Sequence, residues 1–220
     1  MHQPEAAADV HAAAMAAIEA HIEQHLGRIN LVYHSPLSED AHIDVLRIPP
    51  SESFPYVRFV TCGMSSWRMN TAGLDVPARA ELMITLPADW PVVQNSWEDP
   101  EHYWPIDLLK SLARLPMQFD TWLGWGHSVP YSDPPQSYAD NCAFTGCILL
   151  QPVNAGPDFD WIALPGGEGA AVYSVVPLYP EELALKLEQG VDALLAGFGA
   201  HGISDIVWLD RANAAYHASP

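Results

Sequence analysis

The sequence predicts an α/β protein of the α+β type, with a mixed, mainly antiparallel sheet flanked by helices. Short runs of β-branched and aromatic residues recur along the chain, separated by Pro and Gly turn signals. Three longer segments instead show the spacing of a helix with one apolar face. The 20 prolines argue against a helical bundle, because proline interrupts helix interiors. With neither a repeat nor a linker, residues 1–220 are expected to form a single domain.

The first half of the chain is predicted to be one helix followed by strands. The N-terminal helix occupies the segment 1–27, over residues 5–26, where apolar side chains recur every fourth position and Gly27 can end it. The spacings between the later runs are too short for helical crossovers, which favours antiparallel neighbours. The expected strands are Ile29–Tyr33, Ile43–Ile48, Tyr56–Cys62 and Arg79–Leu86.

The second half is predicted to alternate helices and strands. A helix starts at Pro105, since proline suits a first helical position, and a long loop follows from Gln118 to Cys142. Another helix opens at Pro180, carries one continuous apolar stripe to Phe198, and ends near Gly197 and Gly199. The remaining apolar segments are predicted as strands at Phe144–Val153 and Ala171–Leu178, and as a short strand or helix at Ile203–Leu209.

The charge is strongly acidic, with 27 acids against 9 bases and a net charge of −18. No Lys or Arg occurs from Leu115 to Leu185, a stretch that holds eight acids. Nucleic acid and anionic membrane surfaces are therefore not expected as partners, because both are bound through Lys and Arg. A basic protein partner would be attracted and steered by this field, although an acidic excess can also serve solubility alone.

A cytoplasmic location is expected. The first base is Arg28, so the N-terminus has no basic region of the kind that opens a secretory signal. No window holds the roughly 20 apolar residues needed to span a bilayer. The three cysteines (Cys62, Cys142 and Cys147) are odd in number and lack a Cys-x-x-Cys spacing, which indicates reduced thiols.

No catalytic, metal or cofactor site is predicted. His21 and His25 have the helical spacing of a metal-binding pair, but no third ligand accompanies them. His127 lies between glycines and could act as a base, yet the adjacent Ser128 is expected to point elsewhere, so we favour a structural role that orders the loop. The run Pro165–Gly169 lacks the Gly-Lys-Ser/Thr ending of a phosphate-binding loop and is expected to join two strands.

Four segments of the chain resemble the suppressor of fused domain family. They are Ala80–Pro87 (AELMITLP), Trp104–Arg114 (WPIDLLKSLAR), Gly124–Ser128 (GWGHS) and Val175–Leu183 (VVPLYPEEL). The resemblance extends over about Ile43–Leu209, and the second segment with the following Gly-x-Gly-His is its most specific part. It implies a non-enzymatic α/β domain that binds other proteins. Stand-alone bacterial members look like immunity proteins of toxin systems, and His127 matches the family's loop histidine.

The expected function is therefore a protein-binding module, in one version an immunity protein that neutralises a cationic toxin. The alternative is a hydrolase or small-molecule enzyme centred on His127, and a third possibility is a structural subunit. The predicted partner-binding residues belong to the tryptophan-rich loop and to the acids near it, because aromatic rings are enriched in protein interfaces and acids attract a basic partner. They are Trp122, Trp125, His127, Asp120 and Asp133.

Overall fold

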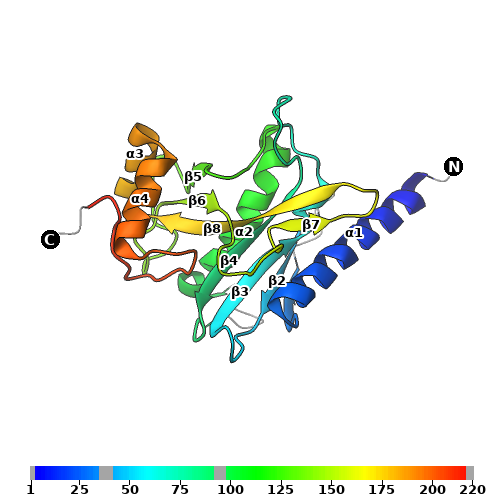
Figure 1. Ribbon diagram of the computed structural model, residues 1–220, viewed down its shortest axis with the longest axis horizontal. Coiled ribbons are helices and arrows are strands. Elements are labelled where there is room, and N and C mark those ends of the chain that lie inside the picture. Colours follow the sequence, from blue (N-terminus) through cyan, green and yellow to red (C-terminus); the bar gives the residue numbers. More distant parts are fainter. Residues whose placement is uncertain (1–2, 35–41, 92–97, 217–220) are drawn as a thin grey trace.

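The computed structural model describes residues 3–34, 42–91 and 98–216, and Figure 1 shows one twisted sheet with helices on both sides. Its eight strands follow the order β1-β2-β3-β4-β8-β6-β5, with β7 paired to β8 beside this path. The strands are β1 (Leu31–Tyr33), β2 (Asp44–Ile48), β3 (Tyr56–Cys62), β4 (Ala80–Pro87), β5 (Ser128–Pro130), β6 (Gly146–Leu150), β7 (Trp161–Ala163) and β8 (Gly169–Leu178). Only the β4–β8 pair is parallel. The predicted mixed, mainly antiparallel sheet is confirmed.

Strand β8 is the centre of this sheet. It pairs with β4 on one side and with β7 and then β6 on the other. Side chains alternate along a strand, so Tyr173 and Val175 face one layer of helices and Val172 and Val176 face the other. Burial on both faces explains why β8 reads as a nearly continuous apolar run.

One face of the sheet is covered by α2 (Pro100–Phe119), which begins five residues before the predicted start at Pro105. Pro105 therefore lies inside the helix and cannot donate to the carbonyl of Glu101. The Asn141 side-chain amide donates to that carbonyl instead, at 2.9 Å. The helix packs through an apolar stripe that includes Trp104, Leu108, Leu109 and Leu112.

The opposite face is covered by α1 (Gln3–Leu26) and by the pair α3 (Pro180–Gln189) and α4 (Val191–His201), which lie at the two ends of β8 (Figure 1). In α1, Ile18, Ile22 and Leu26 are buried against the sheet together with Phe159, so the predicted N-terminal helix is confirmed. Sequence periodicity predicted a single helix from Pro180, but Gly190 with φ 90° separates α3 from α4.

Gly197 does not end the last helix as predicted but lies within α4. A Cβ at this position would meet the carbonyl oxygen of Ala214 at 2.6 Å, so glycine lets the C-terminal segment pass close to the helix. The predicted element at Ile203–Leu209 reduces to a single bridge between Ile206 and Thr85. Within the predicted 118–142 loop, the structure adds the three-residue strand β5.

A buried ion pair joins the C-terminal segment to the start of α3. Arg211 donates to both carboxylate oxygens of Glu182, at 2.5 and 2.6 Å, and also to the carbonyl of Pro177 at 2.8 Å. Glu182 is fully buried and accepts the backbone N–H groups of Tyr179 and Ala214 as well. The two charges are thus paired and hydrogen-bonded, as burial requires.

We predict that Glu182→Gln lowers the free energy of unfolding by about 3–5 kcal/mol, because it leaves the Arg211 guanidinium buried without a counterion. Urea unfolding followed by circular dichroism measures this change. The control is Glu181→Gln on the neighbouring exposed residue, which should unfold at nearly the wild-type urea concentration. Equal midpoints for the two variants would contradict the importance of the ion pair.

Phe159→Ala should also be destabilising, by about 3–5 kcal/mol, because it opens a cavity between α1 and the sheet. Phe159 is 0% exposed, whereas Phe119 is 72% exposed and offers a matched control. Phe119→Ala should change stability by less than about 0.5 kcal/mol. Thermal and urea unfolding of both variants test whether α1 belongs to the cooperative core.

Candidate functional site

A fully buried carboxylate, that of Glu81 in β4, organises one end of the sheet. Its Oε1 accepts the N–H of Gly63 at 3.1 Å and both the N–H and the hydroxyl of Ser65 at 2.9 and 2.7 Å. Its Oε2 accepts the Thr61 hydroxyl at 2.5 Å. Burial raises the pKa of Glu81, while these donors act in the opposite direction. The carboxylate fixes the turn that follows β3.

That turn, which contains the short helix η1 (Met64–Ser66), positions Arg79. The Nη1 of Arg79 donates to the carbonyls of Ser65 and Ser66 at 2.7 and 3.1 Å. Its Nε donates to Glu168 Oε2 at 2.6 Å, while Arg68 donates to Glu168 Oε1 at 2.7 Å. Glu168 thus bridges two guanidinium groups, and Arg79 in particular lowers the pKa of its carboxyl.

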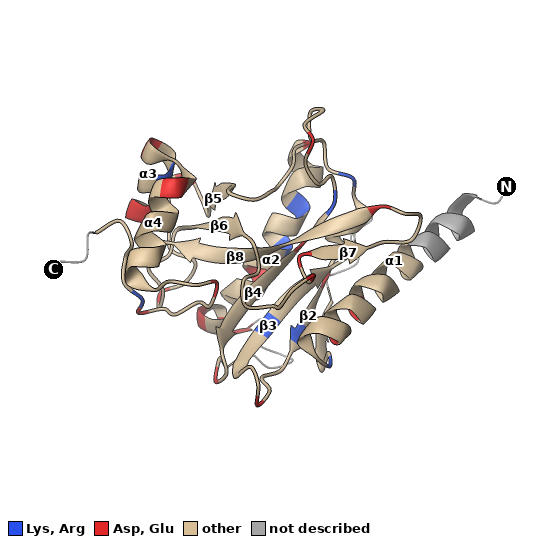
Figure 2. Cartoon of the chain, viewed as in Figure 1, with Lys and Arg blue, Asp and Glu red and all other residues tan. Residues whose placement is uncertain are grey.

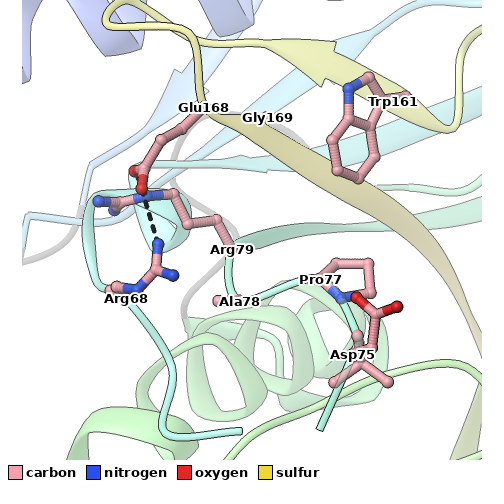
Figure 3. A pocket seen from close by; sticks show the side chains of 9 residues that line it. Arg68, Asp75, Pro77, Ala78, Arg79, Trp161, Glu168 and Gly169 are labelled. Atoms are coloured by element: carbon pink, nitrogen blue, oxygen red, sulfur yellow. Dashed lines mark hydrogen bonds and ion pairs between the residues drawn. The ribbon is translucent and has the colours of Figure 1, made fainter. Parts of the chain in front are cut away.

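The bridge forms one wall of a surface pocket of about 380 Å³. Figure 3 shows both guanidinium groups converging on Glu168 at one side, with Trp161, Pro77 and Asp75 at the other. Two arginines face two acids, so the pocket carries no excess positive charge for a phosphate. An exposed indole beside paired charges is instead suited to a side chain or backbone segment of a protein.

Sequence reasoning missed this pocket. Arg68 and Arg79 lie 100 and 89 residues before Glu168, so no local motif joins them. The run Pro165–Gly169 was predicted to be a loop between strands, and it does join β7 to β8. The one feature of the sequence that pointed to this pocket was the acid Glu168 within that glycine-rich run.

The predicted loop at Trp122–His127 lies beside β6 and α3. Its backbone is fixed by hydrogen bonds from Gly126 N to Leu149 O and from Leu149 N to His127 O, at 2.7 and 2.9 Å. The rings of Trp122 and His127 are in contact, with centroids 4.1 Å apart. Burial is the main reason that the pKa of His127 is lowered, and nearby Lys186 lowers it further. Trp125 is 45% exposed, so the loop is half-buried and presents one ring to solvent.

The two predicted acids are exposed and lie outside this ring contact. Asp120 ends α2 with a positive φ of 46° and accepts the Asn70 side-chain amide at 3.1 Å. Asp133 lies three residues beyond the end of β5. A groove of about 180 Å³ runs between α2 and β5, and Phe119 and Tyr131 line it with exposures of 72% and 51%. Each acid is thus within two residues of an exposed aromatic ring at this groove.

The histidines of α1 pack against the protein. His21 Nε2 lies 3.0 Å from the carbonyl oxygen of Phe159, and the His21 and His25 rings both contact the Phe159 ring. Two other groups of side chains bring three ligand atoms to within 4.8 Å of one another: His34, His42 and Asp44, and, near the start of α2, Asp99, Glu101 and His102.

The comparisons with known proteins agree on one family. The family model described as Suppressor of fused protein (SUFU) matches residues 39–212. The structure is similar to that of a SUFU homologue from Neisseria gonorrhoeae, with a TM-score of 0.69 and 14% identity over 93% of this chain and 98% of that chain. It is similar to the Sufu–Fu complex crystal structure, with a TM-score of 0.65 and 17% identity over 92% of each chain.

Drosophila Suppressor of Fused also shares the fold, with a TM-score of 0.66 and 16% identity over 92% of this chain. The match covers 51% of that protein, so the present chain spans about half its length. No curated protein matches the sequence.

The cysteines are predicted to be unreactive in the folded protein. Cys62, Cys142 and Cys147 are free and buried, and burial raises the pKa of each, that of Cys147 to about 12. A thiol reagent such as DTNB should modify them at least about 100-fold more slowly in buffer than in denaturant. Raised thiol pKa values also make folding stability fall as the pH rises above about 8.5, where only the unfolded thiols ionise. Rapid labelling of native protein would contradict this assignment.

Proposed function

The chain belongs to the suppressor of fused protein family, and from this premise we propose that it is a non-enzymatic module that works by binding another protein. The Sufu–Fu complex shows that one protein of this fold binds a protein partner. The chemistry of the present chain supports the same class of function. Its three thiols are buried with raised pKa values, and the two arginines of its pocket both pair with one acid, Glu168.

The hydrolase alternative around His127 gains no support from the contacts of that residue. Its ring lies against Trp122, and Ser128, the neighbour in sequence, begins strand β5. A role in ordering the loop explains both observations. We therefore retain recognition as the function of this region.

We propose that the partner is a basic protein, and the observation that carries this is the acidic excess of the surface. Of the nine Lys and Arg residues, Arg58, Lys110 and Arg211 are buried, and Arg68 and Arg79 are paired with Glu168. Figure 2 shows the Lys and Arg residues, in blue, dispersed over several elements of the chain. Four acids are buried as well, so the surface keeps nearly the whole acidic excess of the chain. Such a field speeds the approach of a cationic partner.

The proposed contact surface is the predicted set Trp122, Trp125, His127, Asp120 and Asp133 together with the adjoining α2–β5 groove. Trp125, Phe119 and Tyr131 expose large rings, which act as anchors in protein interfaces. The acids beside them would surround such anchors with charge that complements a basic partner.

The finer proposal is that of an immunity protein which neutralises a cationic toxin in the bacterial cytoplasm. The acidic surface and the similarity to a Neisseria gonorrhoeae protein support it. The free state of all three cysteines is consistent with a reducing compartment. Within the described part of the chain, no helix has the length and apolarity to cross a bilayer.

We also propose that residues 1–220 form a single domain. One sheet contains strands from residue 31 to residue 178, and the flanking α1 and α4 pack onto that same sheet. An independent unit would need a core of its own.

The experiment tests the partner and the surface together. Tagged protein is used to capture ligands from its native source at low ionic strength, and a basic protein is expected to be released as salt rises above about 0.15 M. With the partner in hand, Trp125→Ala should weaken binding at least about tenfold through faster dissociation. Trp161→Ala is the matched control, since Trp125 and Trp161 are 45% and 51% exposed.

Two double Asp→Asn variants distinguish long-range electrostatic attraction from direct contact with the partner. Replacing Asp120 and Asp133 with Asn, or the distant pair Asp158 and Asp160, removes the same charge and should slow association similarly. Only the first pair should also speed dissociation. A larger loss with Trp161→Ala than with Trp125→Ala would move the contact surface to the pocket of Figure 3. A salt-insensitive complex would overturn the proposal of a basic partner.

A further inference from the structure

The register of the first three strands gathers two histidines around one buried aspartate. Tyr33 of β1 pairs with Val45 of β2, so the next residue, His34, lies opposite Asp44. His42 precedes Asp44 by two positions and therefore projects toward the same face of the sheet. The sequence separates these side chains by up to ten residues, and strand pairing unites them.

The side chains are oriented as well as close. His34 Nδ1 and His42 Nε2 lie 3.1 and 3.2 Å from the same atom, Asp44 Oδ2. The two imidazole rings have centroids 6.3 Å apart, and the three ligand atoms all fall within 4.8 Å of one another. A tetrahedral ion bound at about 2.0–2.2 Å from each ligand separates its ligand atoms by about 3.3–3.6 Å, so the two distances to Asp44 Oδ2 need to widen only slightly.

The group of His34, His42 and Asp44 is buried on the side of Asp44 and open to solvent on the side of His34. The side chain of Asp44 is 6% exposed and that of His34 is 70% exposed, so solvent reaches the group from the histidine side. From the α2 side, Lys110 Nζ donates to the backbone carbonyl of His34 at 3.1 Å and so fixes the strand end that carries this ligand.

We infer that His34, His42 and Asp44 form a binding site for a divalent transition-metal ion, with Zn²⁺ as the ion they suit best. Two imidazole nitrogens and one carboxylate oxygen are a ligand set that zinc accepts, and three protein ligands leave a fourth position for water or a partner's side chain. Ca²⁺ and Mg²⁺ fit less well, because they prefer a full set of oxygen ligands. No metal site was predicted from the sequence, because strand register and not helical spacing brings these three side chains together.

The ion would act as a clip between the end of β1 and the start of β2. Strand β1 has three residues and lies at the edge of the sheet, so few backbone hydrogen bonds hold it. Binding to the folded form alone raises the stability of that form in proportion to the logarithm of ion concentration. The clip would therefore raise the thermal stability of the whole protein.

The test is calorimetric titration of the full, untagged, chelator-treated chain with ZnCl₂. A single ion per chain is expected, with a dissociation constant of about 1 µM or tighter. His34→Gln should weaken binding at least about tenfold and abolish the rise in melting temperature on addition of zinc. His34 is exposed, so this variant should fold normally, which its circular dichroism and its zinc-free melting temperature verify.

His102→Gln is the matched control, because His102 Nδ1 also lies beside a carboxylate oxygen, that of Asp99, at 2.7 Å. This variant, and the double replacement of His21 and His25 by Gln, should bind zinc as the wild type does. The inference is overturned if His34→Gln binds zinc unchanged or if either control loses the ion. A wild-type dissociation constant above about 100 µM would overturn it equally, as adventitious binding.

Discussion

The fold depends on the burial of β8 on both faces. This strand pairs in parallel with β4 and antiparallel with β6 and β7, and each layer of helices packs on one set of its alternating side chains. A parallel pair needs a long connection, and the chain between β4 and β8 is where α2, β5, β6 and β7 are formed. The loop at Trp122–His127 and the acids Asp120 and Asp133 all belong to that connection. The candidate contact surface is thus held in place because the segment that carries it is anchored to β4 at one end and to β8 at the other.

The local sequence pattern correctly predicted the strands whose limits are marked by nearby residues alone. The strands β2, β3 and β4 were predicted to within one or two residues, because alternation and flanking prolines mark their limits. The pattern was wrong where a tertiary contact overrides it. Pro105 reads as a helix start, yet α2 continues through it because Asn141 satisfies the freed carbonyl of Glu101. The stripe from Pro180 to Phe198 reads as one helix, since apolar periodicity does not register the turn that Gly190 makes.

The candidate sites show the same difference between what local sequence predicts and what tertiary contacts decide. Trp122 and His127 lie in one loop, and sequence alone could group them. Arg68, Arg79 and Glu168 meet only because β8 returns to the start of β4, and the buried Glu81 then holds the turn that positions Arg79. Likewise, His34 and Asp44 face each other through the β1–β2 register. Such groups depend on strand pairing across the chain, which periodicity does not encode.

The use of positive charge links the fold to its function. The protein has nine bases and places three of them in buried positions, where each satisfies neighbouring carbonyl or carboxylate oxygens. Buried in this way, a base contributes to folding but presents little charge to a partner. Four acids are buried too, so the exposed surface keeps nearly the whole acidic excess of the chain. Surface acids repel one another and so tend to destabilise the folded state. The fold gains nothing from this repulsion, whereas a surface that binds a basic protein would use the same charge. A basic partner would remove that repulsion, so the charge that opposes folding would favour the complex.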